Sequence, residues 1–277
     1  MTITTLAGVE SGLTYPIIAA KNEVNSANST SQWMTSFYSA GFPSAAAAPT
    51  PGVSGAALTT YDGQIPFTNP ASGNTYLAGY RRSFFNSTAN ASQRTAMLVD
   101  RLWHNSGLDR TLTTAQTVNS VAWPARDING STNGEGVYLA IEISTTMGTG
   151  TPTITVSYTN SAGTAGRSGV GILSTRASAP AGHWFPIGLQ AGDTGVRSVQ
   201  SVTFSVTWGT AGVLHLVAYR PIAMINAASM PANYSADDAL TLAVPQLWNN
   251  TVLQSVCVSA TNGSGDSGPM LVQYTQG

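Results

Sequence analysis

Hydrophobic and polar residues alternate along much of the chain beyond residue 110. Valine, leucine and isoleucine occupy every second position within residues 137–143, and the same period recurs in residues 154–158 and 202–208. A period of two places one face of a strand in a core and the other face outward. These segments are therefore predicted to be half-buried β-strands.

Segments rich in glycine and asparagine separate these strands and predict tight turns, as at residues 129–136, 147–150 and 160–166. Further strands are expected at residues 196–208, 213–220, 252–258 and 270–274. Successive strands joined by short turns, without crossover helices, favour an antiparallel β-sandwich. The expected fold is mainly β and jelly-roll-like.

The first 95 residues follow a different pattern. Trp33, Phe37 and Tyr38 have the spacing of one helix face, with serine and threonine before them, so one short helix is predicted near residues 30–40. Prolines in residues 44–52 predict an extended or loop-like continuation.

This change in pattern predicts two regions. Residues 1–95 are expected to form an irregular, loop-rich arm that docks on a neighbouring protein, with a loop-rich subdomain as the alternative. Residues 96–277 are expected to form the β-sandwich. If so, cutting the chain after about residue 60 should leave the sandwich folded and abolish attachment.

Charge is scarce in this sequence. Charged residues make up 8% of the chain and the formal net charge is -1, whereas an average soluble domain has about 25% charged residues. A net charge near zero promotes association, so a homo-oligomer is expected. The basic residues are ten arginines and one lysine, a choice that suits interfaces but that compositional drift also explains. They are scattered among twelve acidic residues, which argues against a nucleic-acid-binding face.

Neither membrane insertion nor signal-directed export is expected. No apolar run approaches the roughly 18 residues of a membrane span, and residues 1–5 lack the pattern of a signal peptide. The single cysteine, Cys257, excludes an internal disulfide and a multi-cysteine zinc site. We expect it to be a small buried apolar residue.

One segment invites comparison with an enzyme. Residues 263–269, with Asp266 and Ser267, resemble the nucleophile loop of chymotrypsin-like proteases but lack one glycine. None of the three histidines stands in the sequence setting of the general base of those proteases. They are His104, His183 and His215. The segment is therefore predicted to be a turn before the last strand, and His215 to be an ordinary strand residue.

No metal or cofactor signature accompanies these residues. The histidines lack paired ligand spacing, and the glycine-rich segments lack a phosphate-loop lysine. Calcium binding by acidic residues such as Asp237, Asp238, Glu135 and Glu142 is an alternative without an EF-hand pattern. Glycoside hydrolysis by two cleft carboxylates is the remaining enzyme alternative. We predict no enzyme activity and no cofactor.

Four motif segments, residues 100–107, 123–130, 151–160 and 190–201, resemble a group of virion structural proteins of tailed bacteriophages. They read Asp-Arg-Leu-Trp-His-Asn-Ser-Gly, Trp-Pro-Ala-Arg-Asp-Ile-Asn-Gly, Thr-Pro-Thr-Ile-Thr-Val-Ser-Tyr-Thr-Asn and Gln-Ala-Gly-Asp-Thr-Gly-Val-Arg-Ser-Val-Gln-Ser. The resemblance extends over most of the chain from Ile65 onward. It implies a protein of the virion, assembled in the cytoplasm of the host bacterium.

Within such a particle, the leading hypothesis is a capsid decoration, or cement, protein that binds the phage major capsid protein through the arm. The alternative is a collar, tail or fibre protein that binds host-surface saccharide or other virion proteins. By analogy with other particle proteins, the expected homo-oligomer is a trimer.

The candidate partner-binding residues are of two kinds. Trp33, Phe37 and Tyr38 would lie on the arm. Arg126 and Arg197 lie in predicted loops of the motif segments, where they could bind a partner or, alternatively, pair within the fold. Asp193 could cap backbone amides at a turn.

Overall fold

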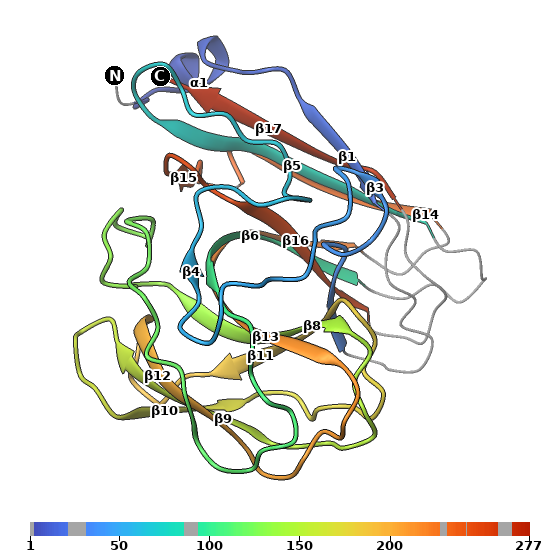
Figure 1. Ribbon diagram of the computed structural model, residues 1–277. Coiled ribbons are helices and arrows are strands. Elements are labelled where there is room, and N and C mark those ends of the chain that lie inside the picture. Colours follow the sequence, from blue (N-terminus) through green and yellow to red (C-terminus); the bar gives the residue numbers. More distant parts are fainter. Residues whose placement is uncertain (1–2, 22–31, 86–93, 228–231, 242, 260–267) are drawn as a thin grey trace. The chain divides into compact units, whose positions relative to one another are not determined.

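The computed structural model describes residues 3–21, 32–85, 94–227, 232–241, 243–259 and 268–277 (Figure 1). These residues form antiparallel strands and one short helix, α1 (Leu6–Ser11), so the predicted mainly β, antiparallel fold is confirmed. The strands are β1 (Ile17–Lys21), β2 (Gln32–Thr35), β3 (Gly41–Phe42), β4 (Ala56–Ala57), β5 (Thr75–Phe85), β6 (Arg94–His104), β7 (Gln116–Thr117), β8 (Tyr138–Thr145), β9 (Ile154–Asn160), β10 (Arg167–Gly171), β11 (His183–Gly188), β12 (Val196–Phe204), β13 (Val213–Ala227), β14 (Ala232–Asp238), β15 (Gln246–Leu247), β16 (Leu253–Ser259) and β17 (Met270–Gln276).

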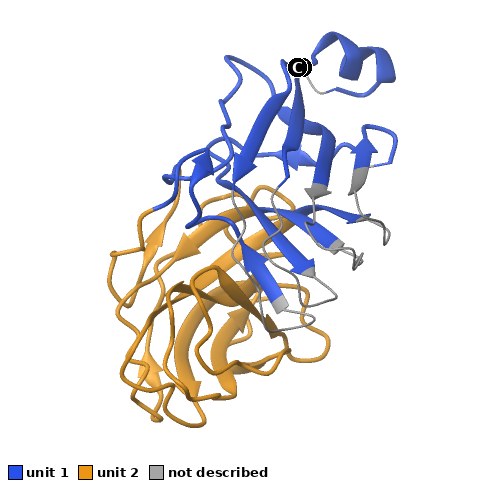
Figure 2. Cartoon of the chain, turned by 90° about the vertical axis from the view of Figure 1, so that its right-hand side faces the viewer, with its two compact units in different colours: residues 1–46, 60–99, 222–277 blue, residues 47–59, 100–221 orange. Residues whose placement is uncertain are grey.

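The chain divides into two compact units (Figure 2). Unit 1 comprises residues 1–46, 60–99 and 222–277, and unit 2 comprises residues 47–59 and 100–221. The division falls within β6 and β13, each of which contributes residues to both units.

Unit 2 is built from strands in the order β6-β13-β8-β11-β10-β9-β12-β7, with β4 beside β6. The alternation predicted for residues 154–158 is present in β9, where every second residue is buried. The core contains three fully or almost fully buried tryptophans, Trp103, Trp123 and Trp208. Because Phe→Ala or Trp→Ala changes in cores usually cost about 3–5 kcal/mol, these rings supply a large share of the stability of unit 2.

Unit 1 contains two sheets. One has the order β14-β5-β17-β1-β3, with β15 beside β5, and the other comprises β2, β16 and the unit 1 residues of β6 and β13. Its core includes Leu77 and Tyr80 of β5 and Val272 of β17. Helix α1 packs on β17, where the Thr275 hydroxyl donates to the Val9 carbonyl oxygen at 2.8 Å (Figure 1).

The predicted strands beyond residue 110 are confirmed. They correspond to β8, β9, β12, β13, β16 and β17, although β12 ends at Phe204, four residues before the expected end. Cys257 of β16 is buried, as expected.

The predicted helix near residues 30–40 is wrong. Residues Gln32–Thr35 form strand β2, which pairs with β16 so that Met34 lies opposite Cys257. Serine and threonine are weak helix formers, and the partner strand supplies the backbone hydrogen bonds that a helix would otherwise provide. The one helix observed, α1, begins instead after Thr5, whose hydroxyl oxygen accepts from the Gly8 amide at 3.1 Å.

The predicted boundary near residue 95 does not match the two units. Strand β1 pairs with β17 at the far end of the sequence, and β5 pairs with both β14 and β17. The region expected to be an irregular arm therefore supplies strands of a sheet, because its apolar residues are buried against residues 222–277.

Lys21, the single lysine of the chain, links β1 to loop residues of unit 1 by hydrogen bonds. Its buried ammonium group donates to the carbonyl oxygens of Phe37 at 3.0 Å, Ser44 at 3.1 Å and Gly63 at 3.3 Å. An ammonium has three donors, so one side chain ties two loops to β1. Burial lowers the pKa of Lys21 to about 8.

We expect an amine-reactive ester at pH 7 to leave Lys21 unmodified in the folded protein and to modify it after unfolding in urea. The reason is that attack needs an accessible, uncharged amine, whereas this one is buried and bonded to three carbonyls. Tandem mass spectrometry of both samples locates the label. Equal labelling of Lys21 in the two samples would contradict the observed clamp.

Candidate functional site

Two motif segments meet at a buried ion pair between Asp100 of β6 and Arg126. The guanidinium binds the carboxylate through Nε at 3.0 Å and Nη2 at 3.1 Å. Its Nη1 donates to the Leu58 carbonyl oxygen at 2.7 Å, and Nη2 also donates to that of Arg101 at 3.1 Å. A two-point arginine–carboxylate contact fixes both position and orientation, so this pair joins β6, the 123–130 segment and the loop at Leu58.

The next residue of β6 makes a second buried contact. Arg101 Nη1 lies 2.7 Å from Glu142 Oε2, with both side chains fully buried, and its Nε donates to His104 Nδ1 at 3.2 Å. Burial and the neighbouring Arg101 charge lower the pKa of His104 to about 2. His104 is therefore a neutral acceptor at pH 7.

His215 of β13 is held in the same region. One ring nitrogen, Nδ1, lies 2.8 Å from the Asn105 carbonyl oxygen, and the other, Nε2, lies 2.7 Å from Ser144 Oγ. Burial lowers the pKa of His215 to about 4. The arrangement fits a neutral ring that donates from Nδ1 and accepts at Nε2.

The other two motif aspartates also bind within the fold. The Asp127 carboxylate accepts from backbone amides of four residues in its own loop and from the Ser131 hydroxyl at 2.7 Å. Asp193 accepts from the Tyr158 hydroxyl at 2.5 Å, Asn160 Nδ2 at 2.7 Å and Arg167 Nε at 2.9 Å. The expectation that Asp193 caps backbone amides is thus replaced by contacts with side chains of the 151–160 segment and β10.

These contacts suit positioning rather than turnover. The side chains of Asp100, Arg101 and Glu142 are 0% exposed, and their ion pairs are with protein side chains, Asp100 with Arg126 and Arg101 with Glu142. No sequence motif marks this network of buried charges. The feature of the sequence that could have indicated it is the occurrence of charged residues inside apolar strands of a chain with few charges.

The structure separates the candidate partner-binding residues into two groups. Phe37 and Arg126 are each only 2% exposed, and Arg126 binds Asp100, so the proposed contact with a partner does not fit either residue. Trp33 and Tyr38 are half-buried, and Arg197 is half-buried and donates to Asn133 Oδ1. Only these three retain surface that a partner could touch.

The remaining candidate residues are easily placed. His183 is fully buried in β11, whereas Asp266 and Ser267 lie outside the described residues. Of the acidic residues considered for calcium, Glu142 is bound to Arg101, and Glu135 accepts from the Thr194 hydroxyl at 2.9 Å. Among the residues that the structure describes, no three histidine, cysteine or acidic side chains are grouped to hold a metal ion.

Acidification from pH 7 to pH 5 is expected to lower the free energy of unfolding. Burial holds the folded pKa values of His215 and His183 at about 4 and that of His104 at about 2, against 6.5 in the unfolded chain. The unfolded chain then binds more protons as the pH falls below 6.5. Each histidine therefore removes up to about 1.4 kcal/mol per pH unit. Urea unfolding at pH 7, 6 and 5 measures the slope, and replacing one histidine, as in His215→Gln, should reduce it by about a third.

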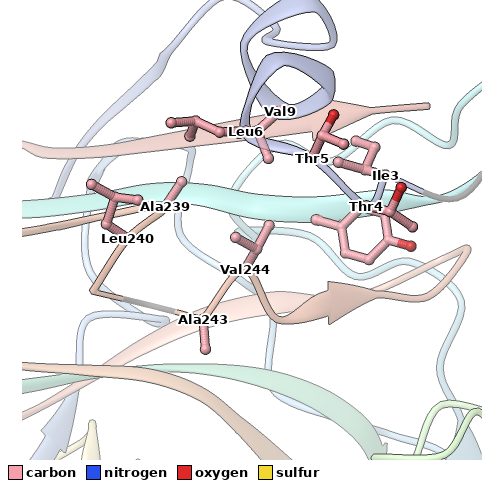
Figure 3. Close-up of a pocket in the computed structure, with 10 residues that line it drawn as sticks. Ile3, Thr4, Thr5, Leu6, Val9, Ala239, Leu240, Ala243 and Val244 are labelled. Carbon is pink, nitrogen blue, oxygen red and sulfur yellow. The ribbon is translucent and has the colours of Figure 1, made fainter.

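Two pockets lie apart from the buried network. One, of about 330 Å³ in unit 1, is formed by residues near α1, by Tyr76 and by the segment after β14 (Figure 3). The other, of about 360 Å³ in unit 2, is formed by residues 151–154 and 171–175. Residues of the second pocket are uncharged and include Thr151, Thr153 and Ser174.

No helix in the described ranges has both the length and the apolar character needed to cross a membrane.

Comparison with known proteins identifies no family. No family model matches the chain, and no curated protein shows significant similarity. Among solved structures, that of infectious bursal disease virus Gt strain is 10% identical, with 96% of this chain and 81% of that chain covered and a TM-score of 0.22. The VP2 subviral particle of infectious bursal disease virus is 9% identical, with 95% and 80% covered and the same TM-score. These TM-scores are too low to establish a shared fold.

Proposed function

We propose that this chain is a structural component of a tailed bacteriophage particle, and specifically a capsid decoration protein that binds the major capsid shell. The proposal starts from the four motif segments, which resemble virion structural proteins. Their charged side chains hold the fold together, as the Asp100–Arg126 pair illustrates. Charged side chains that stabilise the fold in this way are suited to a rigid structural protein.

The observation that carries the proposal is how few charges are left on the surface. The chain has only eleven basic and twelve acidic residues, and eight of those whose side chains the structure describes are buried. The buried ones are Lys21, Arg82, Asp100, Arg101, Arg126, Asp127, Glu142 and Arg220. Charged residues are depleted at the centres of protein interfaces, so a surface this poor in charge favours contact with other protein surfaces.

The decisive experiment is the location and copy number of the protein in purified particles. Hundreds of copies spread over the shell, together with binding of the purified protein to expanded capsids, are the expected result. A dozen or fewer copies at one vertex, without binding to capsids, would refute the decoration role.

A collar, tail or fibre role is the second candidate. The pocket of unit 2 favours it, because hydroxyl-bearing residues, including Thr151, Thr153 and Ser174, are among its uncharged lining residues, which suits a neutral saccharide. Binding of the purified protein to host cells or lipopolysaccharide, with none to expanded capsids, would support this candidate over decoration.

Self-association is part of the proposal. The low surface charge favours a homo-oligomer, and the trimer is adopted from other particle proteins. Of the paired aromatic side chains on β8 and β13, Tyr138 is 38% exposed and could lie on a shared face, whereas Tyr219 is only 5% exposed. Sedimentation velocity at micromolar concentration should give a trimer, and a stable monomer would contradict it.

A further inference from the structure

The pocket of unit 1 has the size of a small-molecule site and is open to solvent on one side. Two segments far apart in sequence form its walls, residues 3–9 around α1 and, after β14, residues 239, 240, 243 and 244, as Figure 3 shows. Its volume of about 330 Å³ lies within the range of about 300–1,000 Å³ typical of ligand pockets.

The rim of this pocket leaves apolar side chains in water. Leu6 is 62% exposed and Leu240 is 76% exposed, and both line the same space. A single exposed leucine is ordinary, but two on opposite segments around a cavity form a surface that an apolar occupant would cover.

The wall after β14 has an unusual backbone conformation at Ala243 and Val244. Ala243 and Val244 have φ values of 52° and 49°, in the left-handed region that a β-branched valine rarely adopts. The preceding turn is fixed by Asp238, whose carboxylate accepts from the amides of Leu240 at 2.9 Å and Thr241 at 3.2 Å. Backbone strain that a fixed surrounding structure maintains is characteristic of ligand-binding segments.

The lining determines the chemistry of the occupant. Seven of the ten lining residues are apolar, none is charged, and the other three carry hydroxyl groups. The Thr5 hydroxyl caps α1, whereas those of Thr4 and Tyr76 make no hydrogen bond within the described part of the chain. A charged ligand would lose its hydration here without gaining a partner of opposite charge.

We propose that this pocket binds a small, uncharged, mainly apolar molecule that carries one hydroxyl or carbonyl group. The body of the molecule lies against Leu6, Val9 and Leu240, and its polar group bonds with Thr4 or Tyr76. This inference does not depend on the proposed role in the particle.

The test is titration of the full chain with 1-octanol, followed by saturation-transfer nuclear magnetic resonance, with octanoate as the charged counterpart. Saturable octanol binding, at least about tenfold tighter than octanoate binding, is expected because only the carboxylate must be desolvated. Ala239→Trp places an indole in the pocket and should weaken octanol binding at least about tenfold. Ala236→Trp, on the exposed face of β14 and outside the pocket, is the matched control and should bind as the unchanged protein does.

Leu240→Ser is a second variant, at an exposed position where folding is not in question, and should weaken octanol binding about threefold or more because it removes apolar contact. Octanol binding that does not saturate, or that is equal in Ala239→Trp and Ala236→Trp, would overturn the proposal. So would octanoate binding as tight as that of octanol. Loss of self-association in Ala239→Trp, without any octanol binding to the unchanged protein, would assign the pocket to a side chain of a second copy instead.

Discussion

Arg126→Met is expected to lower the free energy of unfolding by about 3–5 kcal/mol, because it leaves the buried Asp100 carboxylate without its main partner. The change also removes the donors to the carbonyl oxygens of Leu58 and Arg101. Arg220 lies 4.0 Å from Asp100 and is too distant to replace both contacts. Urea denaturation followed by tryptophan fluorescence measures the loss, since tryptophans occupy the core of unit 2.

Two variants control this prediction. Arg197→Met removes an equally long cation that is only half-buried, and should cost about 0.5 kcal/mol or less. The double variant Asp100→Leu/Arg126→Met removes both charges and should recover part of the loss, as replacement of a buried pair by apolar residues often does. If Arg126→Met and Arg197→Met were equally stable, the buried pair would not hold unit 2 together.

Deleting residues 1–60 is expected to unfold unit 1, contrary to what the sequence pattern suggested. The deletion removes the five residues of β1 and the four of β2, which pair with β17 and β16. It also removes the Lys21 clamp. These contacts are a large share of the margin of about 5–15 kcal/mol that keeps a domain folded. Size-exclusion chromatography and the far-ultraviolet circular dichroism of the deleted protein test this.

A shorter deletion, of residues 1–12, is the control. It removes α1 but keeps every strand, so the protein should remain folded and lose only the contacts of Val9 and Gly12 with β17. A protein lacking residues 1–60 that stays monomeric with native circular dichroism would restore the arm interpretation.

The sequence pattern predicted some strands and missed others, and the difference depends on how far apart in the sequence the paired strands lie. Residues 154–160 alternate because one face of β9 covers the core of unit 2, whereas residues 139–143 of β8 and 214–220 of β13 are buried on both faces. Strands β1 and β2 pair with partners more than 200 residues away, as in Ile17 opposite Val272. No local pattern reveals such a partner, so these residues were assigned to an arm and a helix.

Strands β5 and β6 were not predicted, because buried charged residues interrupt their apolar pattern. In β6, Asp100 and Arg101 interrupt an apolar run as an exposed turn would, yet both are fully buried. In β5, Arg82 is only 2% exposed, and its guanidinium donates to the Ser255 hydroxyl at 2.5 Å. An interpretation that assigns every charged residue to the surface therefore fails to predict these strands.

Two candidate partner-binding residues are buried because their contacts lie far away in the sequence. Arg126 was expected in a loop, where it could bind a partner or pair within the fold, and the structure shows the second, with its carboxylate partner, Asp100, 26 positions earlier in the sequence. Phe37 had the spacing of a helix face, but its ring stacks on Tyr61 with centroids 5.4 Å apart. The pocket around α1 could not be predicted from the sequence, because its two walls are separated by more than 220 residues.

The burial of a third of the charged residues also predicts how the protein responds to ionic strength. Dissolved salt largely screens the interaction between exposed charges that are farther apart than the Debye length, about 10 Å at 0.1 M, and acts much less on buried pairs. Contacts made by this surface should therefore persist in concentrated salt, where electrostatically steered complexes dissociate. Excluded anions such as sulfate should strengthen them, because they favour the removal of apolar surface from water.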